Sequence, residues 1–133
     1  STRAGTVGVS MAKNATQIYV ASLVIAKATA EAICNDNPRL VTIVAMGNQG
    51  EVKTDEDEQC AFYLRNLIEG RYQDREAIRT LVVNSRWSEN FDDLNQPHFH
   101  PRDREIALQL DSIPFYIKVS REEGLLVARP GEN

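Results

Sequence analysis

The fold is decided by the stretch VTIVAMGNQGEVKTDEDEQCAFYL, residues 41–64. Its first residues form a short apolar run rich in β-branched side chains, which is typical of a strand covered on both faces. Gly47 and Gly50 then mark a loop. Thr54 is a good helix N-cap, and Asp57 stands at the spacing of a capping box. The stretch therefore predicts a buried strand, a glycine-bearing loop and a helix.

Two acids at the start of this helix continue the row of side chains that faces the core. Glu56 lies four residues before Cys60, and Asp57 lies four residues before Ala61, so both precede the apolar stripe by one turn. In open α/β sheets, ligands bind beyond the carboxyl ends of the strands, where this helix start should lie. Two inward carboxylates suit a divalent cation there. First-turn acids also complement the helix dipole without any ligand, so both explanations stay open.

A strand and a helix precede the central stretch. Residues 17–21 predict a buried strand with Ser22 at its carboxyl end, and residues 23–35 predict an alanine-rich helix. Together with a strand at 40–46 they make a βαβ unit, for which a right-handed parallel crossover is the default. We therefore predict an α/β fold with a mixed, mostly parallel sheet flanked by helices. Ser22 and the loop before Thr54 should open at one edge of this sheet.

The chain after the central helix predicts further helices and a final hairpin. Gly70 is suited to end the central helix, Asp74 to start the next one, and a third helix should begin at residues 101–103. Residues 115–119 and 125–128 flank a Glu-Glu-Gly turn, which predicts a C-terminal antiparallel hairpin.

Two further segments carry groups with chemical potential. Ser1–Thr6 is small and polar and includes Arg3, so as a loop before a short helix it offers N–H groups and a guanidinium to an anion. A frayed terminus has the same composition. His98 and His100 lack a third or fourth ligand at zinc spacing, although either remains a candidate acid or base.

Composition places limits on the class of protein. The 133 residues are 42% hydrophobic and 26% charged, as in an ordinary globular protein, so we predict one domain over residues 1–133. A net charge of -4 argues against nucleic acid as a partner. The sequence shows neither a membrane-length apolar run nor a signal peptide, which predicts a cytoplasmic protein without a membrane partner. Cys34 and Cys60 are interpreted as core thiols in a reducing compartment. Without an initiator Met, the chain is expected to be trimmed or a piece of a larger protein.

Several of these elements together resemble the 2-phosphosulfolactate phosphatase family. The most specific part is the motif Glu56-Asp57-Glu-Gln-Cys60-Ala61. The resemblance covers most of the chain in the right order and corresponds to the carboxyl-terminal half of a family member. Its other parts are residues 1–6, 18–22 and 43–47, Asp103 with Asp111, and Ile113-Pro114.

The resemblance implies a Mg²⁺-dependent phosphatase that hydrolyses 2-phospho-3-sulfolactate, or a related small phosphorylated acid, on the path to coenzyme M. It implies that Glu56 and Asp57 are the catalytic, metal-binding pair. Ser22 has no neighbouring base in sequence, and Cys60 should lie one turn inside the helix, against the core, so a metal-activated water is the expected nucleophile. The partners implied are the anionic substrate and either a missing N-terminal half or a second copy. The implied substrate-binding residues are Thr2, Arg3, Gly5, Thr6 and Ser22.

Two other functions are alternatives to a phosphatase. One is a noncatalytic α/β fragment or anion-binding module, in which the same residues hold a small anion or only support assembly. The other is a nucleotide-binding fragment, which βαβ units often form. The segment Gly47-Asn-Gln-Gly50 matches neither glycine-rich nucleotide fingerprint, which argues against the second alternative.

Overall fold

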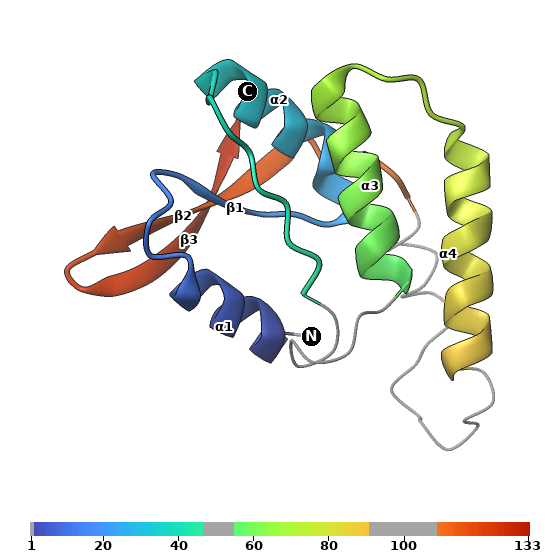
Figure 1. Cartoon of the computed structure of the whole chain (residues 1–133), viewed down its shortest axis with the longest axis horizontal. Coiled ribbons are helices and arrows are strands. Elements are labelled where there is room, and N and C mark those ends of the chain that lie inside the picture. The colour runs from blue at the N-terminus through green and yellow to red at the C-terminus, as the bar shows by residue number, and fades with distance from the viewer. Residues whose placement is uncertain (1, 47–54, 91–108) are drawn as a thin grey trace.

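The structure is a computed structural model that describes residues 2–46, 55–90 and 109–133 (Figure 1). Within these ranges no helix is long and apolar enough to cross a membrane. The elements in chain order are α1 (Thr2–Met11), β1 (Ile18–Val20), the 3₁₀ helix η1 (Leu23–Ile25), α2 (Ala26–Asp36), α3 (Asp55–Glu69), α4 (Arg75–Asn90), β2 (Phe115–Glu122) and β3 (Leu125–Glu132).

Helix α2 is the centre of the packing. It contacts β2 of the sheet and helix α3, and α4 packs against α3 in turn (Figure 1). The many alanines of α2 let its neighbours approach closely. Thr29, which is fully buried within α2, donates its hydroxyl hydrogen bond to Ile25 O at 2.8 Å, so its polar group is satisfied. The core cluster consists of Leu23, Ala26, Tyr63, Val82 and Leu110, bordered by Cys60, Leu67 and Ile78.

The sheet has three strands in the order β1-β2-β3, and both pairings are antiparallel. Strands β2 and β3 form the C-terminal hairpin that the sequence predicts. Its two-residue turn, Glu123-Gly124, has φ values of 51° and 80°, as a type I′ turn requires. Strand β1 pairs with the outer edge of this hairpin, with Ile18 opposite Val119.

The prediction of a mostly parallel sheet is wrong, although helices and strands are mixed as an α/β class implies. Residues 41–46, predicted as a buried strand, form no strand, and they make no backbone hydrogen bond to any other residue that the structure describes. A local apolar pattern predicts an extended conformation but does not select a partner. The βαβ unit predicted for residues 17–46 is therefore not formed, because β1 pairs with β2 instead.

The helix ends were predicted more accurately than the pairing of the strands. Gly70 has φ of 70° directly after α3, which confirms the predicted left-handed stop. Asp74 caps α4 as predicted, because its Oδ1 accepts from the N–H groups of Glu76 at 3.1 Å and Ala77 at 3.2 Å. The helix predicted from residue 101 lies largely outside the described residues, and residues 109–111 are not helical.

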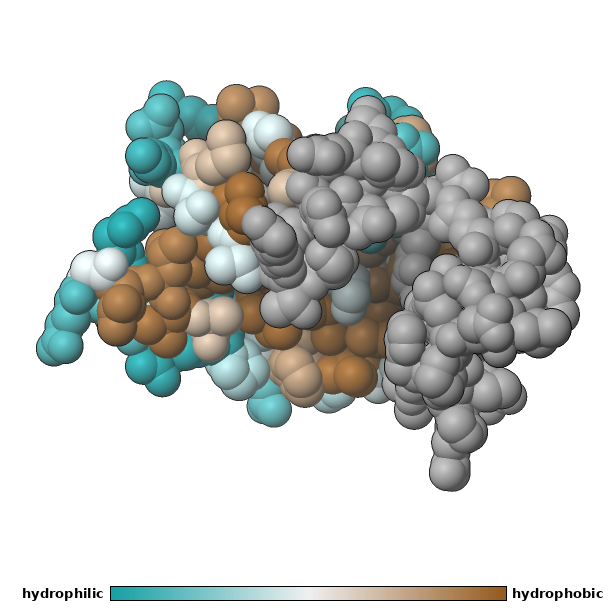
Figure 2. Space-filling model, turned by 90° about the horizontal axis from the view of Figure 1, so that it is seen from below, coloured by the Kyte–Doolittle hydropathy of each residue, from teal (hydrophilic) through white to brown (hydrophobic). Residues whose placement is uncertain are grey.

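The two faces of the sheet differ in chemistry. The register places Phe115 and Ile117 on one face of β2 and Lys118 on the other. The Lys118 face meets the end of α2, where Asp36 accepts a hydrogen bond from the Tyr19 hydroxyl and lies 3.7 Å from the Lys118 ammonium. Figure 2 shows hydrophobic residues gathered on the side of the molecule where the hairpin lies, and extending toward its middle.

Candidate functional site

The predicted acidic pair lies at the start of α3. Helix α3 begins at Asp55, next to the predicted cap Thr54, so the helix start was predicted to within one residue. Glu56 belongs to the first turn, and its side chain lies outside what the structure describes. Asp57 is half-buried and has an interaction partner. That both carboxylates project inward as a pair stays a prediction.

The N-terminal segment is a helix and not the predicted anion loop. Helix α1 includes Thr2, Arg3, Gly5 and Thr6, so the expectation of a loop over residues 1–6 is wrong. Thr6 is exposed, and the side chains of residues 2–5 lie outside the described part. A helix start leaves unpaired backbone N–H groups in its first turn, and this is the part of a helix at which anions are favoured.

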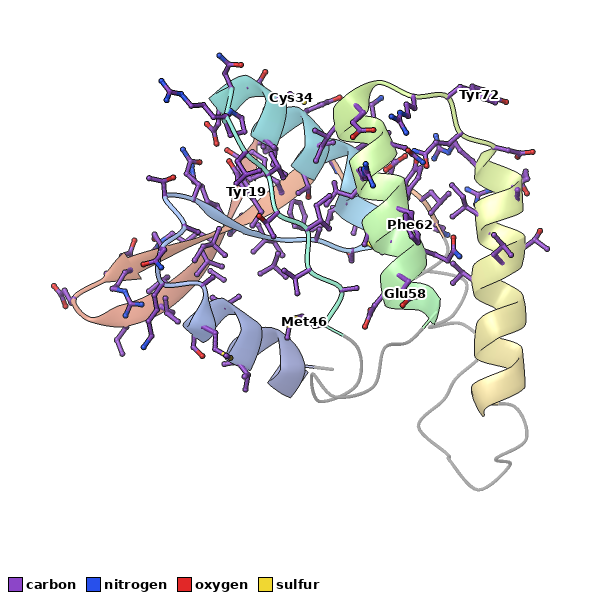
Figure 3. All side chains as sticks on the ribbon, viewed as in Figure 1. Tyr19, Cys34, Met46, Glu58, Phe62 and Tyr72 are labelled. Carbon is purple, nitrogen blue, oxygen red and sulfur yellow. The ribbon has the colours of Figure 1, made fainter. Side chains whose placement is uncertain are left out.

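Helix α1 packs closely against Met46 at the position of Gly8. A Cβ atom added to Gly8 would lie 2.6 Å from the Met46 Sδ atom, so the absence of a side chain at Gly8 makes room for this methionine. Figure 3 shows Met46 at the end of the extended segment, beside α1, and Glu58 near the start of α3. The starts of α1 and α3 and the end of the extended segment lie on the same lower side of the molecule in Figure 1.

Ser22 occupies a different setting from the one predicted. It is exposed, its backbone is extended (φ −147°, ψ 169°), and its side chain makes no cap hydrogen bond to η1. Because β1 is antiparallel to β2, Ser22 does not stand at the carboxyl edge of a parallel sheet, contrary to the prediction. The next residue, Leu23, packs into the core cluster that Cys60 borders, which places Ser22 near the middle of α3.

A buried polar cluster around Asp111 was missed by sequence reasoning. The Asp111 side chain is only 5% exposed and lies 3.5 Å from Arg75 Nη2, while its Oδ1 accepts from Lys27 N–H at 2.8 Å. Its other oxygen accepts a hydrogen bond from the Tyr63 hydroxyl. Arg75 also donates to Leu110 O at 2.7 Å. One carboxylate thus joins the start of α2, the middle of α3 and the start of α4.

The backbone of Asp111 explains why this cluster was hard to predict. A helix was predicted to begin at residues 101–103 and to lead up to this position, yet Asp111 has φ of 58° in a left-handed turn. Asp tolerates this conformation better than most residues. The sequence feature that indicates this turn is the run of turn residues Asp111-Ser-Ile-Pro114. Burial, and then the hydrogen bond and charge of the Asp111 carboxylate, raise the pKa of Tyr63 well above its ordinary value. Tyr63 therefore stays a neutral hydrogen-bond donor even near pH 10, where an ordinary tyrosine loses its proton.

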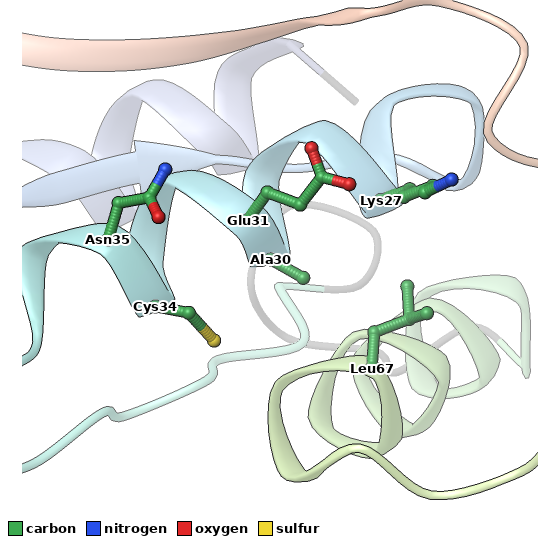
Figure 4. A pocket seen from close by; sticks show the side chains of 6 residues that line it. All are labelled: Lys27, Ala30, Glu31, Cys34, Asn35 and Leu67. Carbon is green, nitrogen blue, oxygen red and sulfur yellow. The ribbon is translucent and has the colours of Figure 1, made fainter. Parts of the chain in front are cut away.

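The cysteines differ from the prediction of two core thiols. Cys60 is half-buried, whereas Cys34 is exposed, so the prediction is wrong for Cys34. Figure 4 shows Cys34 beside a shallow hollow between α2 and α3. None of the predicted site residues borders it. Its lining residues are Lys27, Ala30, Glu31, Cys34, Asn35 and Leu67.

Histidine, cysteine and acidic side chains are the groups that most often bind metal ions in proteins. In the described ranges no three such residues come together. His98 and His100, candidates for acid or base chemistry, lie outside those ranges. Mg²⁺ commonly takes only one or two carboxylates and completes its shell with water and substrate oxygens. The donor set Glu56 and Asp57 fits that requirement without a third protein ligand.

These features define an α/β protein with one helix start that bears acids, at α3, and another in its N-terminal segment, at α1. The family model described as 2-phosphosulpholactate phosphatase matches residues 1–109, which include both. The chain therefore belongs to the 2-phosphosulpholactate phosphatase family, and this membership indicates a phosphatase-like function. No curated protein and no solved structure matches the chain.

Proposed function

We propose that this chain supplies part of a Mg²⁺-dependent phosphomonoesterase that acts on 2-phospho-3-sulfolactate or a related small phosphorylated acid. The observation that carries the proposal is the family match over residues 1–109, which spans α1 and the acidic start of α3. Within the proposal, the chain is a single domain that forms the carboxyl-terminal half of a larger phosphatase-like protein. A cytoplasmic location and a place on the path to coenzyme M belong to the same proposal.

Each proposed site residue has a role that its chemistry suits. Glu56 and Asp57 hold Mg²⁺ through carboxylate oxygens, directly or through water. When bound, the cation neutralises the negative charge that builds up on the transferred phosphoryl group. The Arg3 guanidinium clamps the anion, and the N–H groups of the first turn of α1 donate to its oxygens. Ser22 contributes its hydroxyl group to substrate binding, because this hydroxyl makes no cap hydrogen bond to η1.

The half-buried position of Asp57 supports this assignment. A carboxylate that is partly shielded from water interacts with a cation more strongly than one in bulk solvent, because the local dielectric constant is lower. The competing explanation is a noncatalytic anion-binding module, in which the same acids only stabilise the N-terminus of α3.

Calorimetry and phosphate release separate these two functions. We expect the wild-type chain to bind Mg²⁺ and to release phosphate from a sulfonated phosphomonoester at millimolar ligand. Glu56→Gln and Asp57→Asn should each lower kcat/KM by about 100-fold or more. Glu76→Gln on α4, whose side chain is 78% exposed, is the matched control and should change kcat/KM by less than about twofold. A folded wild-type chain that gives neither binding heat nor phosphate would favour the noncatalytic module over the phosphatase.

A further inference from the structure

Helix α1 is only lightly attached to the rest of the described chain. It has no extensive contact with another helix or strand that the structure describes. Val7 is 46% exposed and Met11 is 74% exposed, so neither of these apolar side chains is buried. Among residues 6–11, only Gly8 and Val9 are half-buried. The docking of α1 is therefore concentrated at these two positions.

The sequence of α1 does not favour a free helix. The element has 10 residues, among them Gly5 and Gly8, and it carries no acid in its first turn and no base in its last turn. A helix shorter than about 12 residues is marginal in water on its own, and each glycine costs about 1 kcal/mol relative to alanine. Helix α1 therefore needs its docking contact to stay folded.

The thioether of Met46 lies at this docking contact. A Cβ atom built on Gly8 would be 2.6 Å from the Met46 Sδ atom and 2.7 Å from its Cε atom, so the two residues pack directly against each other. Figure 3 shows Met46 beside α1. The Met46 side chain is half-buried, which leaves part of it open to small molecules in solution.

We infer that Met46 is an oxidation site whose sulfoxide undocks α1. Hydrogen peroxide transfers one oxygen atom to Sδ: the O–O bond breaks, an S–O bond forms, water leaves, and the sulfur loses two electrons. The product is polar where the thioether was apolar. Its oxygen cannot point toward Gly8, where a carbon atom would already lie 2.6 Å from the sulfur, and it has to be hydrated. The contact with Gly8 is then lost, and α1 unfolds.

The oxidation of Met46 is reversible, because sulfoxide reductases return the thioether. Peroxide and reductase together make the contact between Met46 and Gly8 a redox-sensitive switch for the N-terminal segment. The inference rests on packing alone and holds with or without the proposed phosphatase activity. Under the proposed function, the same step moves Arg3 and Thr6 away from the substrate.

The chain contains only two methionines, Met11 and Met46, which allows a matched comparison. In Met11→Leu only Met46 can form a sulfoxide, and in Met46→Leu only Met11 can. Each variant is treated with hydrogen peroxide and then with a thiol reductant, which restores reversibly oxidised cysteines, and the intact mass shows how many oxygen atoms stay bound. Amide hydrogen exchange is then measured for α1 and for the β2–β3 hairpin.

We expect oxidation of Met11→Leu to speed exchange in α1 by about tenfold or more and to leave the hairpin unchanged, which shows that the rest of the fold persists. A sulfoxide reductase should restore the slow exchange. Oxidised Met46→Leu should exchange like its untreated form, because the Met11 side chain is 74% exposed. Met46→Ala, which removes the thioether without an oxidant, should speed exchange in α1 as oxidation does, whereas Met11→Ala should not.

Three results would overturn the inference. The first is unchanged exchange in α1, either in Met46→Ala or in the chain that carries the Met46 sulfoxide. The second is peroxide that converts Met11 completely and leaves Met46 as the thioether. The third is exchange that speeds equally in α1 and in the hairpin, because the Met46 contact would then support the whole fold and not α1.

Discussion

Replacement of Asp111 is the sharpest test of how the helices are held together. Its carboxylate accepts from Lys27 N–H at 2.8 Å and from the Tyr63 hydroxyl, and it lies 3.5 Å from Arg75 Nη2. In Asp111→Asn, the amide can keep one acceptor oxygen toward Lys27. Its NH₂ group would then face the guanidinium and the hydroxyl, so the charge and at least one hydrogen bond are lost.

The expected cost follows from these contacts. Weakening the charge-assisted bond to the start of α2 costs about 1 kcal/mol, and losing the buried bond to Tyr63 costs about 1–1.5 kcal/mol. The Arg75 pair contributes at most about 1 kcal/mol, because the arginine side chain is 49% exposed. We therefore expect Asp111→Asn to lower the free energy of unfolding by about 2–3 kcal/mol. Asp111→Ala should cost about 1–2 kcal/mol more, since alanine also disfavours a positive φ.

Urea unfolding followed by far-UV circular dichroism measures this loss. Asp36→Asn is a matched control, because Asp36 also accepts from a tyrosine hydroxyl and pairs with a cation, Lys118, but at the more exposed end of α2. Removing its charge there should cost less than about 1 kcal/mol, because the negative end of the helix dipole already disfavours a carboxylate. Equal losses for the two asparagine variants, or a loss below about 0.5 kcal/mol for Asp111→Asn, would show that the cluster does not stabilise the fold.

Two further outcomes are expected. The unfolded chain loses the Tyr63 proton near pH 10, whereas the folded chain retains it because its pKa is raised, so stability should fall as pH rises above about 10. Tyr63→Phe should flatten that fall in urea midpoints measured between pH 8 and pH 11, and an unchanged slope would contradict the assignment. A thiol reagent should modify Cys34 at least about tenfold faster than the half-buried Cys60, as peptide mapping of the labelled native protein would show, and equal rates would contradict the exposure difference.

Local chemistry made several elements predictable from sequence. The left-handed stop at Gly70, the cap at Asp74 and the Glu123-Gly124 turn all depend on residues within a few positions of each other. The exposure of Cys34 was also predictable in principle. Lys27, Glu31 and Cys34 recur at helical spacing, so the two charged residues mark the face on which the thiol lies.

Long-range pairing was the part that the sequence could not settle. Residues 18–20 and 41–46 both have the composition of strands, and nothing in either run indicates that one pairs with β2 while the other pairs with no described strand. The Asp111 cluster has the same origin, since its groups come from four separate segments of the chain. Of the candidate site, sequence reasoning placed the start of α3 correctly but described the first part of α1, up to Thr6, as a loop.

The pairing of β1 with β2 has a consequence for how the protein folds. Ile18 and Val119 meet across a connection of about a hundred residues, and closing such a loop costs about 2 kcal/mol more chain entropy than closing one of ten residues. The β2–β3 hairpin closes across only two residues and can form early. Strand β1 then joins a preformed edge late. During synthesis on the ribosome, the N-terminal strand waits unpaired until nearly the whole chain has emerged, and in this interval it is exposed to misassembly.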